Sequence, residues 1–167
     1  MRITVVGIGN VLLGDDGLGV HAMWRLREAL PDPRIRYMDG GTIGVGLLPY
    51  LEDATHVLFL DAIDAPEGLH AEDGVIDVPL GDGEASHLPL RISPHDLGLE
   101  ELIRLLHMRR GPEPLAVRLL GAAPGAVDIS TELTPAAERA TAGLVLRALA
   151  VLEEWLAEES AVAEEVA

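Results

Sequence analysis

The 167-residue chain contains no cysteine, and each of its 12 basic residues is an arginine. Without cysteine there is no thiol nucleophile, no disulfide and no thiolate metal ligand. Without lysine there is no Schiff-base chemistry and no lysine of the kind that binds phosphate in a Walker-type loop. Any catalytic site must therefore be built from other side chains.

Two further absences narrow the class of protein. The chain has no apolar run of about 18 residues, so no membrane-spanning helix is predicted. Its first residues form a strand-like run, with no separate basic and apolar signal regions, so we expect a cytoplasmic protein. The net charge of −16 argues against nucleic-acid binding, which requires a concentrated basic face. Much of the acidity near the C-terminus is expected to be solvated and to serve solubility.

The pattern of apolar residues predicts one α/β domain. The length, and a composition that is 49% hydrophobic, suit a single substantial core. The predicted strands are residues 2–6, 35–38, 56–60, 74–78 and 115–120, and the predicted helices are residues 17–30, 45–51, 97–108 and 135–156. Thr134 is the predicted N-cap of the last helix, and residues 81–94 are a predicted loop. This alternation predicts a three-layer α/β/α sandwich around a mainly parallel sheet of about five strands. The domain should span residues 1–156, with residues 157–167 as an acidic, frayed tail.

Potential metal ligands stand at loop positions of this pattern. Asp16 follows the first strand, Asp61 ends the apolar run of the third, and His95 follows Pro94 just before a helix. Sites in open parallel sheets form beyond the carboxyl ends of the strands. Two carboxylates and an imidazole are typical ligands of a divalent metal. The spacing therefore predicts that these three side chains converge there.

Each candidate also has a purely structural interpretation. Asp15 or Asp16 is placed to cap the helix that follows. Asp61 can accept hydrogen bonds from loop amides, and His95 can be an ordinary residue at a helix entry. Asp39 opens an Asp-Gly-Gly-Thr segment, which is a turn that can also offer backbone amides to a bound peptide or oxyanion.

Known catalytic and cofactor signatures are mostly missing. Gly7 and Gly9 match the start of a dinucleotide-binding fingerprint, but its third glycine position falls on Leu12, so nucleotide binding is not expected. There is no Gly-x-Ser-x-Gly elbow and no His-Glu-x-x-His motif. The residues alone therefore indicate an α/β domain with a carboxylate and imidazole site, without a substrate.

Taken together, the motifs resemble those of the nickel–iron hydrogenase maturation endopeptidases. The resemblance rests on Gly7-Ile8-Gly9-Asn10, Asp15-Asp16-Gly17-Leu18-Gly19, Asp39-Gly40-Gly41-Thr42, Asp61-Ala62, Ser93-Pro94-His95, and Gly121 with Pro124. These landmarks follow the family order over most of the chain. Each is weak alone, and their combination is specific.

The resemblance implies an enzyme that removes the C-terminal extension of a hydrogenase large-subunit precursor after nickel insertion. The metal-binding roles of the family fall on Asp16, Asp61 and His95, and Asp39 completes the expected catalytic set. Nickel is expected to come from the substrate, without any permanently bound organic cofactor. The expected partner is the precursor, not a nucleic acid or a membrane, and the chain itself is expected to be a monomer or a weak homo-oligomer.

Two other functions remain open on the same fold, because fold alone does not define function. One is a hydrolase with a resident metal that acts on another substrate. The other is a non-enzymatic chaperone that binds nickel or a hydrogenase subunit.

Overall fold

The computed structural model describes residues 1–63, 74–80, 96–111 and 114–165. Its strands are β1 (Ile3–Ile8), β2 (Ile35–Gly41), β3 (His56–Ala62), β4 (Val75–Pro79) and β5 (Ala116–Ala122). Its helices are α1 (Leu18–Ala29), α2 (Leu48–Leu51), α3 (Asp96–Arg110) and α4 (Pro135–Glu165), with 3₁₀ turns η1 (Gly14–Gly17) and η2 (Gly44–Leu47).

The five strands form one sheet in the order β2-β1-β3-β5-β4. The pairs between β2, β1, β3 and β5 are parallel, and β4 joins the edge antiparallel to β5. The mainly parallel sheet and the edge position of the strand near residues 74–78 are therefore confirmed. Gly7 of β1 lies in register between Asp39 of β2 and Leu60 of β3.

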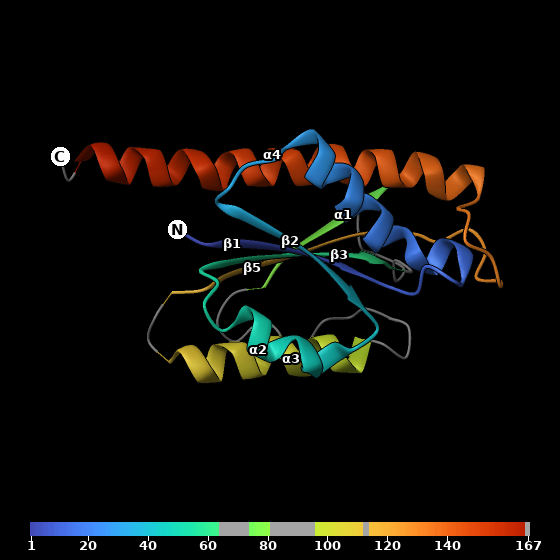
Figure 1. The fold of residues 1–167 in the computed structure, drawn as a ribbon, viewed down its shortest axis with the longest axis horizontal. Helices are drawn as coiled ribbons and strands as arrows, with labels where there is room; N and C mark the ends of the chain where they lie inside the picture. The colour runs from blue at the N-terminus through green and yellow to red at the C-terminus, as the bar shows by residue number, and fades with distance from the viewer. Residues whose placement is uncertain (64–73, 81–95, 112–113, 166–167) are drawn as a thin grey trace.

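Helices cover both faces of the sheet, which makes the predicted three layers (Figure 1). Helices α1 and α4 lie on one face, and α2 and α3 lie on the other. All six residues of β1 are buried, as expected for a strand covered on both sides. Successive side chains alternate between two core clusters, so that Val5 packs towards α1 and α4 and Val6 towards α2 and α3.

The core is densely apolar around β3. Phe59, the single phenylalanine of the chain, has no exposed surface. Leu58 and Leu60 are equally buried on the opposite face. Complete burial of a side chain of this size contributes about 1.5–3 kcal/mol to folding. The central strand is therefore a rigid support for whatever follows its last residue.

Three local expectations need correction. The N-terminus of α1 follows Gly17 and has no side-chain cap, so neither Asp15 nor Asp16 caps it. The predicted helix at residues 45–51 is a 3₁₀ turn followed by a single α-helical turn, because Gly44 has a positive φ of 50° and Pro49 lies within the first turn of α2. The last helix was expected to end near Leu156, but α4 continues to Glu165.

Other expectations at the ends of elements are confirmed. The backbone N–H of Ala137 donates to Thr134 Oγ1 at 3.2 Å, which is the predicted cap of α4. No helix within the described ranges is long and apolar enough to cross a membrane. The predicted loop at residues 81–94 lies outside the described residues.

Candidate active site

The loop after β1 turns back on itself and brings Asp16 next to the end of that strand. Gly9 has a φ of 123°, and a Cβ at this position would lie 1.9 Å from the backbone oxygen of Asp16. The N–H of Asn10 donates to Asp16 Oδ2 at 2.8 Å. Only 9% of Asp16 is exposed. Its carboxylate is therefore fixed at the carboxyl end of β1 by the backbone of its own loop.

Asp61 is the second-to-last residue of β3 and is 5% exposed. Its Oδ1 accepts a hydrogen bond from the N–H of Ala62 at 2.8 Å. Strand alternation places Asp61 on the same face as Val57 and Phe59, which pack towards α2 and α3. The donor belongs to the last residue of β3, so an amide of the strand itself, instead of the expected loop amide, holds the carboxylate at the carboxyl end of the central strand.

Close packing of α1 on the sheet brings these two ends together. A Cβ at Gly19 would lie 2.2 Å from the carbonyl oxygen of Leu60 and 2.6 Å from that of Ile8. The backbone of α1 therefore passes directly over the ends of β1 and β3. The contact is made by Gly19, which follows Asp16 closely in the sequence, and by Leu60, the residue before Asp61. The turn η1, which contains Asp16, also contacts β3. Asp16 and Asp61 thus occupy the carboxyl ends of neighbouring strands, as predicted.

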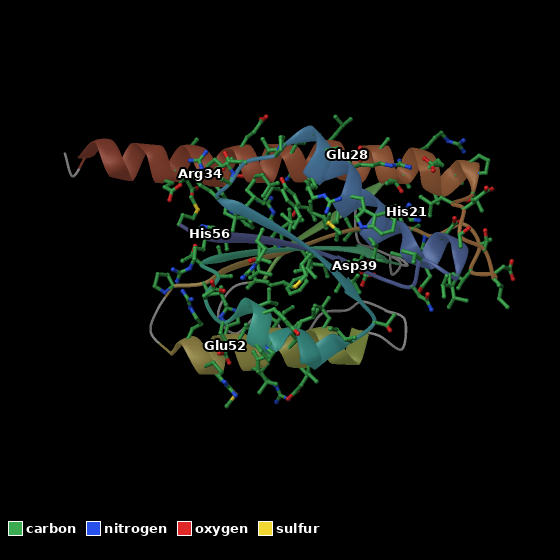
Figure 2. The ribbon with its side chains drawn as sticks, viewed as in Figure 1. His21, Glu28, Arg34, Asp39, Glu52 and His56 are labelled. Carbon is green, nitrogen blue, oxygen red and sulfur yellow. The ribbon has the colours of Figure 1, made fainter. Side chains whose placement is uncertain are left out.

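Asp39 also lies near the carboxyl ends of the strands, but its side chain is on the other face of the sheet from that of Asp61. Alternation in β2 places it with Ile35 and Tyr37, which pack towards α1 and α4. Figure 2 labels Asp39 near the end of β2. Its side chain is exposed, and its Oδ1 accepts a hydrogen bond from the N–H of Gly41 at 2.9 Å. This contact shapes the last residues of β2, because the strand continues to Gly41 and includes most of the Asp-Gly-Gly-Thr segment that was expected to be a turn.

The third predicted ligand, His95, lies outside the described residues, together with Ser93 and Pro94. The helix that follows, α3, begins at the carboxyl end of the sheet, because a Cβ at Gly98 would lie 3.2 Å from the Cα of Gly44 in η2. Among the side chains that the structure describes, no three histidines or carboxylates are grouped to hold a metal ion. The metal-binding roles of Asp16, Asp61 and His95 stay predictions.

Asp15 has a structural role that sequence reasoning missed. It is completely buried, and its carboxylate accepts hydrogen bonds from the N–H groups of Gly125, Ala126 and Thr134 and from the Thr134 hydroxyl, at 2.7–2.8 Å. Burial alone would raise the pKa of Asp15, but these hydrogen bonds outweigh it and the pKa is lowered. Asp15 therefore ties the loop after β1 to the loop after β5.

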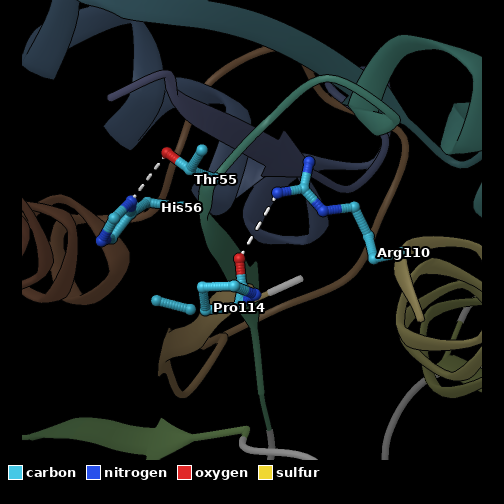
Figure 3. Close-up of a pocket in the computed structure, with 5 residues that line it drawn as sticks. Thr55, His56, Arg110 and Pro114 are labelled. Atoms are coloured by element: carbon cyan, nitrogen blue, oxygen red, sulfur yellow. Dashed lines mark hydrogen bonds between the residues drawn. The ribbon is translucent and has the colours of Figure 1, made fainter. Parts of the chain in front are cut away.

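A cavity of about 410 Å³ lies at the opposite end of the sheet (Figure 3). Thr55 and His56 at the start of β3 line it, with Pro114 and Ala116 at the start of β5. The His56 Nδ1 is 2.9 Å from the Thr55 hydroxyl, and the guanidinium of Arg110 donates to the carbonyl of Pro114. Because it lies at the amino ends of the strands, this cavity is separate from the candidate active site.

Buried carboxylates at the carboxyl end of a mainly parallel sheet lie where α/β proteins bind their ligands. The family model described as hydrogenase maturation protease (HycI) matches residues 20–151. The chain is 32% identical over 156 residues to the hydrogenase 2 maturation protease of Escherichia coli K12, with 92% of each chain covered. It therefore belongs to the hydrogenase maturation protease family, which confirms the resemblance seen in the sequence.

Other relatives agree in sequence and in fold. The hydrogenase expression/formation protein HupD of Rhodobacter capsulatus is 33% identical over 159 residues, which cover 92% of this chain and 72% of HupD. The structure of the hydrogenase maturating endopeptidase HybD from E. coli matches with a TM-score of 0.75, 32% identity, and coverage of 92% of this chain and 93% of HybD. The hydrogenase 2 maturation peptidase of Thaumarchaeota archaeon SCGC_AB-539-E09 has a TM-score of 0.67 and 32% identity, covering 92% and 99% of the two chains.

Proposed function

We propose that this chain is an endopeptidase that removes the C-terminal extension of a nickel–iron hydrogenase large-subunit precursor. We further propose that cleavage follows nickel insertion, because the enzyme uses the nickel carried by its substrate as the recognition element. The observation that carries this proposal is the pair of buried carboxylates, Asp16 and Asp61, at the carboxyl ends of two adjacent strands.

The ligand set of the chain favours a metal that arrives with the substrate. Asp16, Asp61 and the predicted ligand His95 offer two carboxylates and one imidazole, and the chain has no thiolate with which to hold nickel tightly. The precursor's own ligands would complete the coordination when the two proteins dock. A precursor without nickel would lack this central contact, so recognition would also check that the metal is present.

The chain's side chains then have distinct tasks. A metal ion held by Asp16, Asp61 and His95 would polarise the scissile carbonyl or activate a water molecule. Asp16 and Asp61 are held in place by the amides of Asn10 and Ala62, so they need not rearrange when the substrate binds. The turn after Asp39 is proposed to offer backbone amides to the bound peptide.

The decisive experiment compares nickel-loaded and nickel-free precursor, each incubated with chelator-treated enzyme, with mass spectrometry of the precursor's C-terminus as readout. We expect cleavage of the nickel-loaded precursor alone. Equal cleavage of both precursors would contradict nickel recognition and favour a hydrolase with a resident metal. Binding without cleavage, under conditions where a related protease is active, would favour the chaperone function.

A further inference from the structure

Large apolar side chains are exposed on the loops after β1 and β5, beside the candidate active site. Leu12 is 61% exposed in the loop after β1, and Val127 and Ile129 are 53% and 94% exposed in the loop after β5. We call these three residues the apolar rim. Side chains of this kind gain nothing for folding when they remain in water, so a cluster of them marks a candidate interaction surface.

The two loops that bear the rim are joined by backbone hydrogen bonds. The N–H of Gly14 donates to the carbonyl of Ser130 at 2.7 Å, and the N–H of Ser130 donates to the carbonyl of Leu12 at 3.1 Å. The buried carboxylate of Asp15 adds its bonds to Gly125, Ala126 and Thr134. The rim is therefore a preformed surface, and little conformational entropy is lost when a partner covers it.

The rim is continuous with the candidate active site. Leu12 lies in the same loop as Asp16, and the N–H of Asn10, two residues before Leu12, donates to Asp16 Oδ2. A protein whose backbone reaches Asp16 comes close to these loops, because Leu12 lies in the same loop as Asp16. This proximity points to the substrate protein, rather than a separate regulator, as the molecule that covers the rim.

The charge around the rim disfavours a second copy of this chain as its partner. The segments 9–17 and 123–134 contain Asp15, Asp16, Asp128 and Glu132, and they contain no arginine or lysine. Two such surfaces placed face to face would bring like charges together, which opposes association. A partner surface with apolar side chains bordered by lysine or arginine is complementary to it.

We propose that the apolar rim is the docking surface for the folded body of the hydrogenase large-subunit precursor, next to the extension that is cleaved. This inference rests on the proposed function. It adds that affinity comes from contacts outside the metal site, made by Leu12, Val127 and Ile129 with apolar side chains bordered by basic residues. The rim therefore governs KM, while Asp16 and Asp61 govern the chemical step.

The test uses the full chain and the nickel-loaded large-subunit precursor from the same organism. The double variant Leu12→Gln/Ile129→Gln makes the rim polar without a large change in side-chain size. The matched control is Met108→Gln/Leu146→Gln, which changes side chains that are 72% and 69% exposed on α3 and α4. We expect the rim variant to raise KM and the dissociation constant about tenfold or more with kcat unchanged, and the control to stay near wild type.

The outcomes separate this inference from the proposed function. A wild-type chain that binds the precursor through the rim but does not cleave it would leave the docking surface standing and remove the proteolytic function. Normal cleavage with unchanged KM in the rim variant would overturn the docking surface alone, as would an equal loss in the control. A rim variant that changes only the sedimentation of the isolated chain would assign the rim to self-association and overturn the proposal.

Discussion

The two ends of the sheet hold their acidic side chains in different ways. At the amino end, charged partners surround them: Arg36 lies 2.9 Å from Asp53, and the N-terminal ammonium lies 2.5 Å from Glu159. At the carboxyl end, Asp15 and Asp16 accept hydrogen bonds from backbone amides instead.

This difference has an electrostatic consequence. An arginine cancels the charge of its carboxylate, whereas an amide fixes the carboxylate in place and leaves its negative charge intact. The two paired carboxylates at the amino end, Asp53 and Glu159, are thus balanced by their partners. The carboxylates at the carboxyl end retain the charge that a metal ion or a basic partner can use. Variants that exchange or weaken the two kinds of contact test this distinction.

The largest effect is expected where a predicted metal ligand is removed. Asp61→Asn, and likewise His95→Ala, should lower kcat/KM for precursor processing by more than about a thousandfold, because neither replacement restores a metal ligand. Asp53→Asn is the control at the amino end and should process normally. Timed cleavage assays and thermal melts on the same samples measure both effects, and normal cleavage by Asp61→Asn would remove the residue from the site.

Backbone packing gives the next largest contrast. Gly9→Ala should destabilise the protein by about 3 kcal/mol or more, because the new Cβ meets the Asp16 backbone and φ is positive. Gly111→Ala, with a φ of 60° and no atom within 4 Å of the new Cβ, should cost only about 1 kcal/mol. Urea unfolding curves would compare the two, and equal costs would show that the loop after β1 can relax.

Removing one carboxylate from each end should separate amide contacts from ion pairs. Asp15→Asn should lower the free energy of unfolding by about 2–3 kcal/mol, since it places an NH₂ group among N–H donors. Asp53→Asn should cost less than about 1 kcal/mol, because its partners are exposed arginines. High salt should shrink the Asp53 effect and leave the Asp15 effect nearly unchanged. The opposite salt dependence would contradict the comparison.

The smallest effects concern the pH dependence of the free energy of unfolding. The two ends of the sheet should lose stability in separate ranges of pH. Burial against Trp155 and the N-terminal ammonium lower the pKa of His56 below its ordinary value of 6.5, although Glu158 and Glu159 oppose the shift. The neutral ring is favoured in the folded state, so its stabilisation is present above pH 6.5 and is lost as pH falls through the lowered pKa.

The pKa of Asp15 is also lowered, from an ordinary value of 3.8, so its stabilisation is lost only when pH falls below that value and through the lowered pKa. Unfolding free energies measured across pH should show both windows. His56→Gln should flatten only the upper one, and Asp15→Asn only the lower one. A single window abolished by either variant would show that the two ends are coupled.

Most of the fold could be predicted from the sequence, because the patterns that indicate strands and helices lie in short, local stretches of residues. The apolar runs of β1 and β3 predict buried central strands, and the short alternating run at β4 predicts an edge. The role of Asp15 could not be predicted in this way, because the identity of the clamping carboxylate depends on Gly125 and Thr134, far along the chain. Local spacing cannot distinguish Asp15 from its neighbour Asp16.

The length of α4 was missed for a related reason. Glu159 belongs to an acidic stretch that suggests solvation and a frayed tail. In the fold it bonds to the N-terminal ammonium and to Arg34, and the helix continues beyond it. The charged partners that decide its environment come from the other end of the sequence, so composition alone misjudges it.

The hydrogen bonds of Asp15 also determine how late in synthesis the fold around Asp16 can form. They join positions that lie up to 119 residues apart, from the first loop to Thr134 at the start of α4. During synthesis, the loop with Asp16 therefore lacks its anchor until most of the chain has left the ribosome. Closing so long a span of chain is also slow relative to forming a helix. A shortened chain that ends before Gly125 would carry both carboxylates but would lose every bond that Asp15 makes between the loop after β1 and the loop after β5.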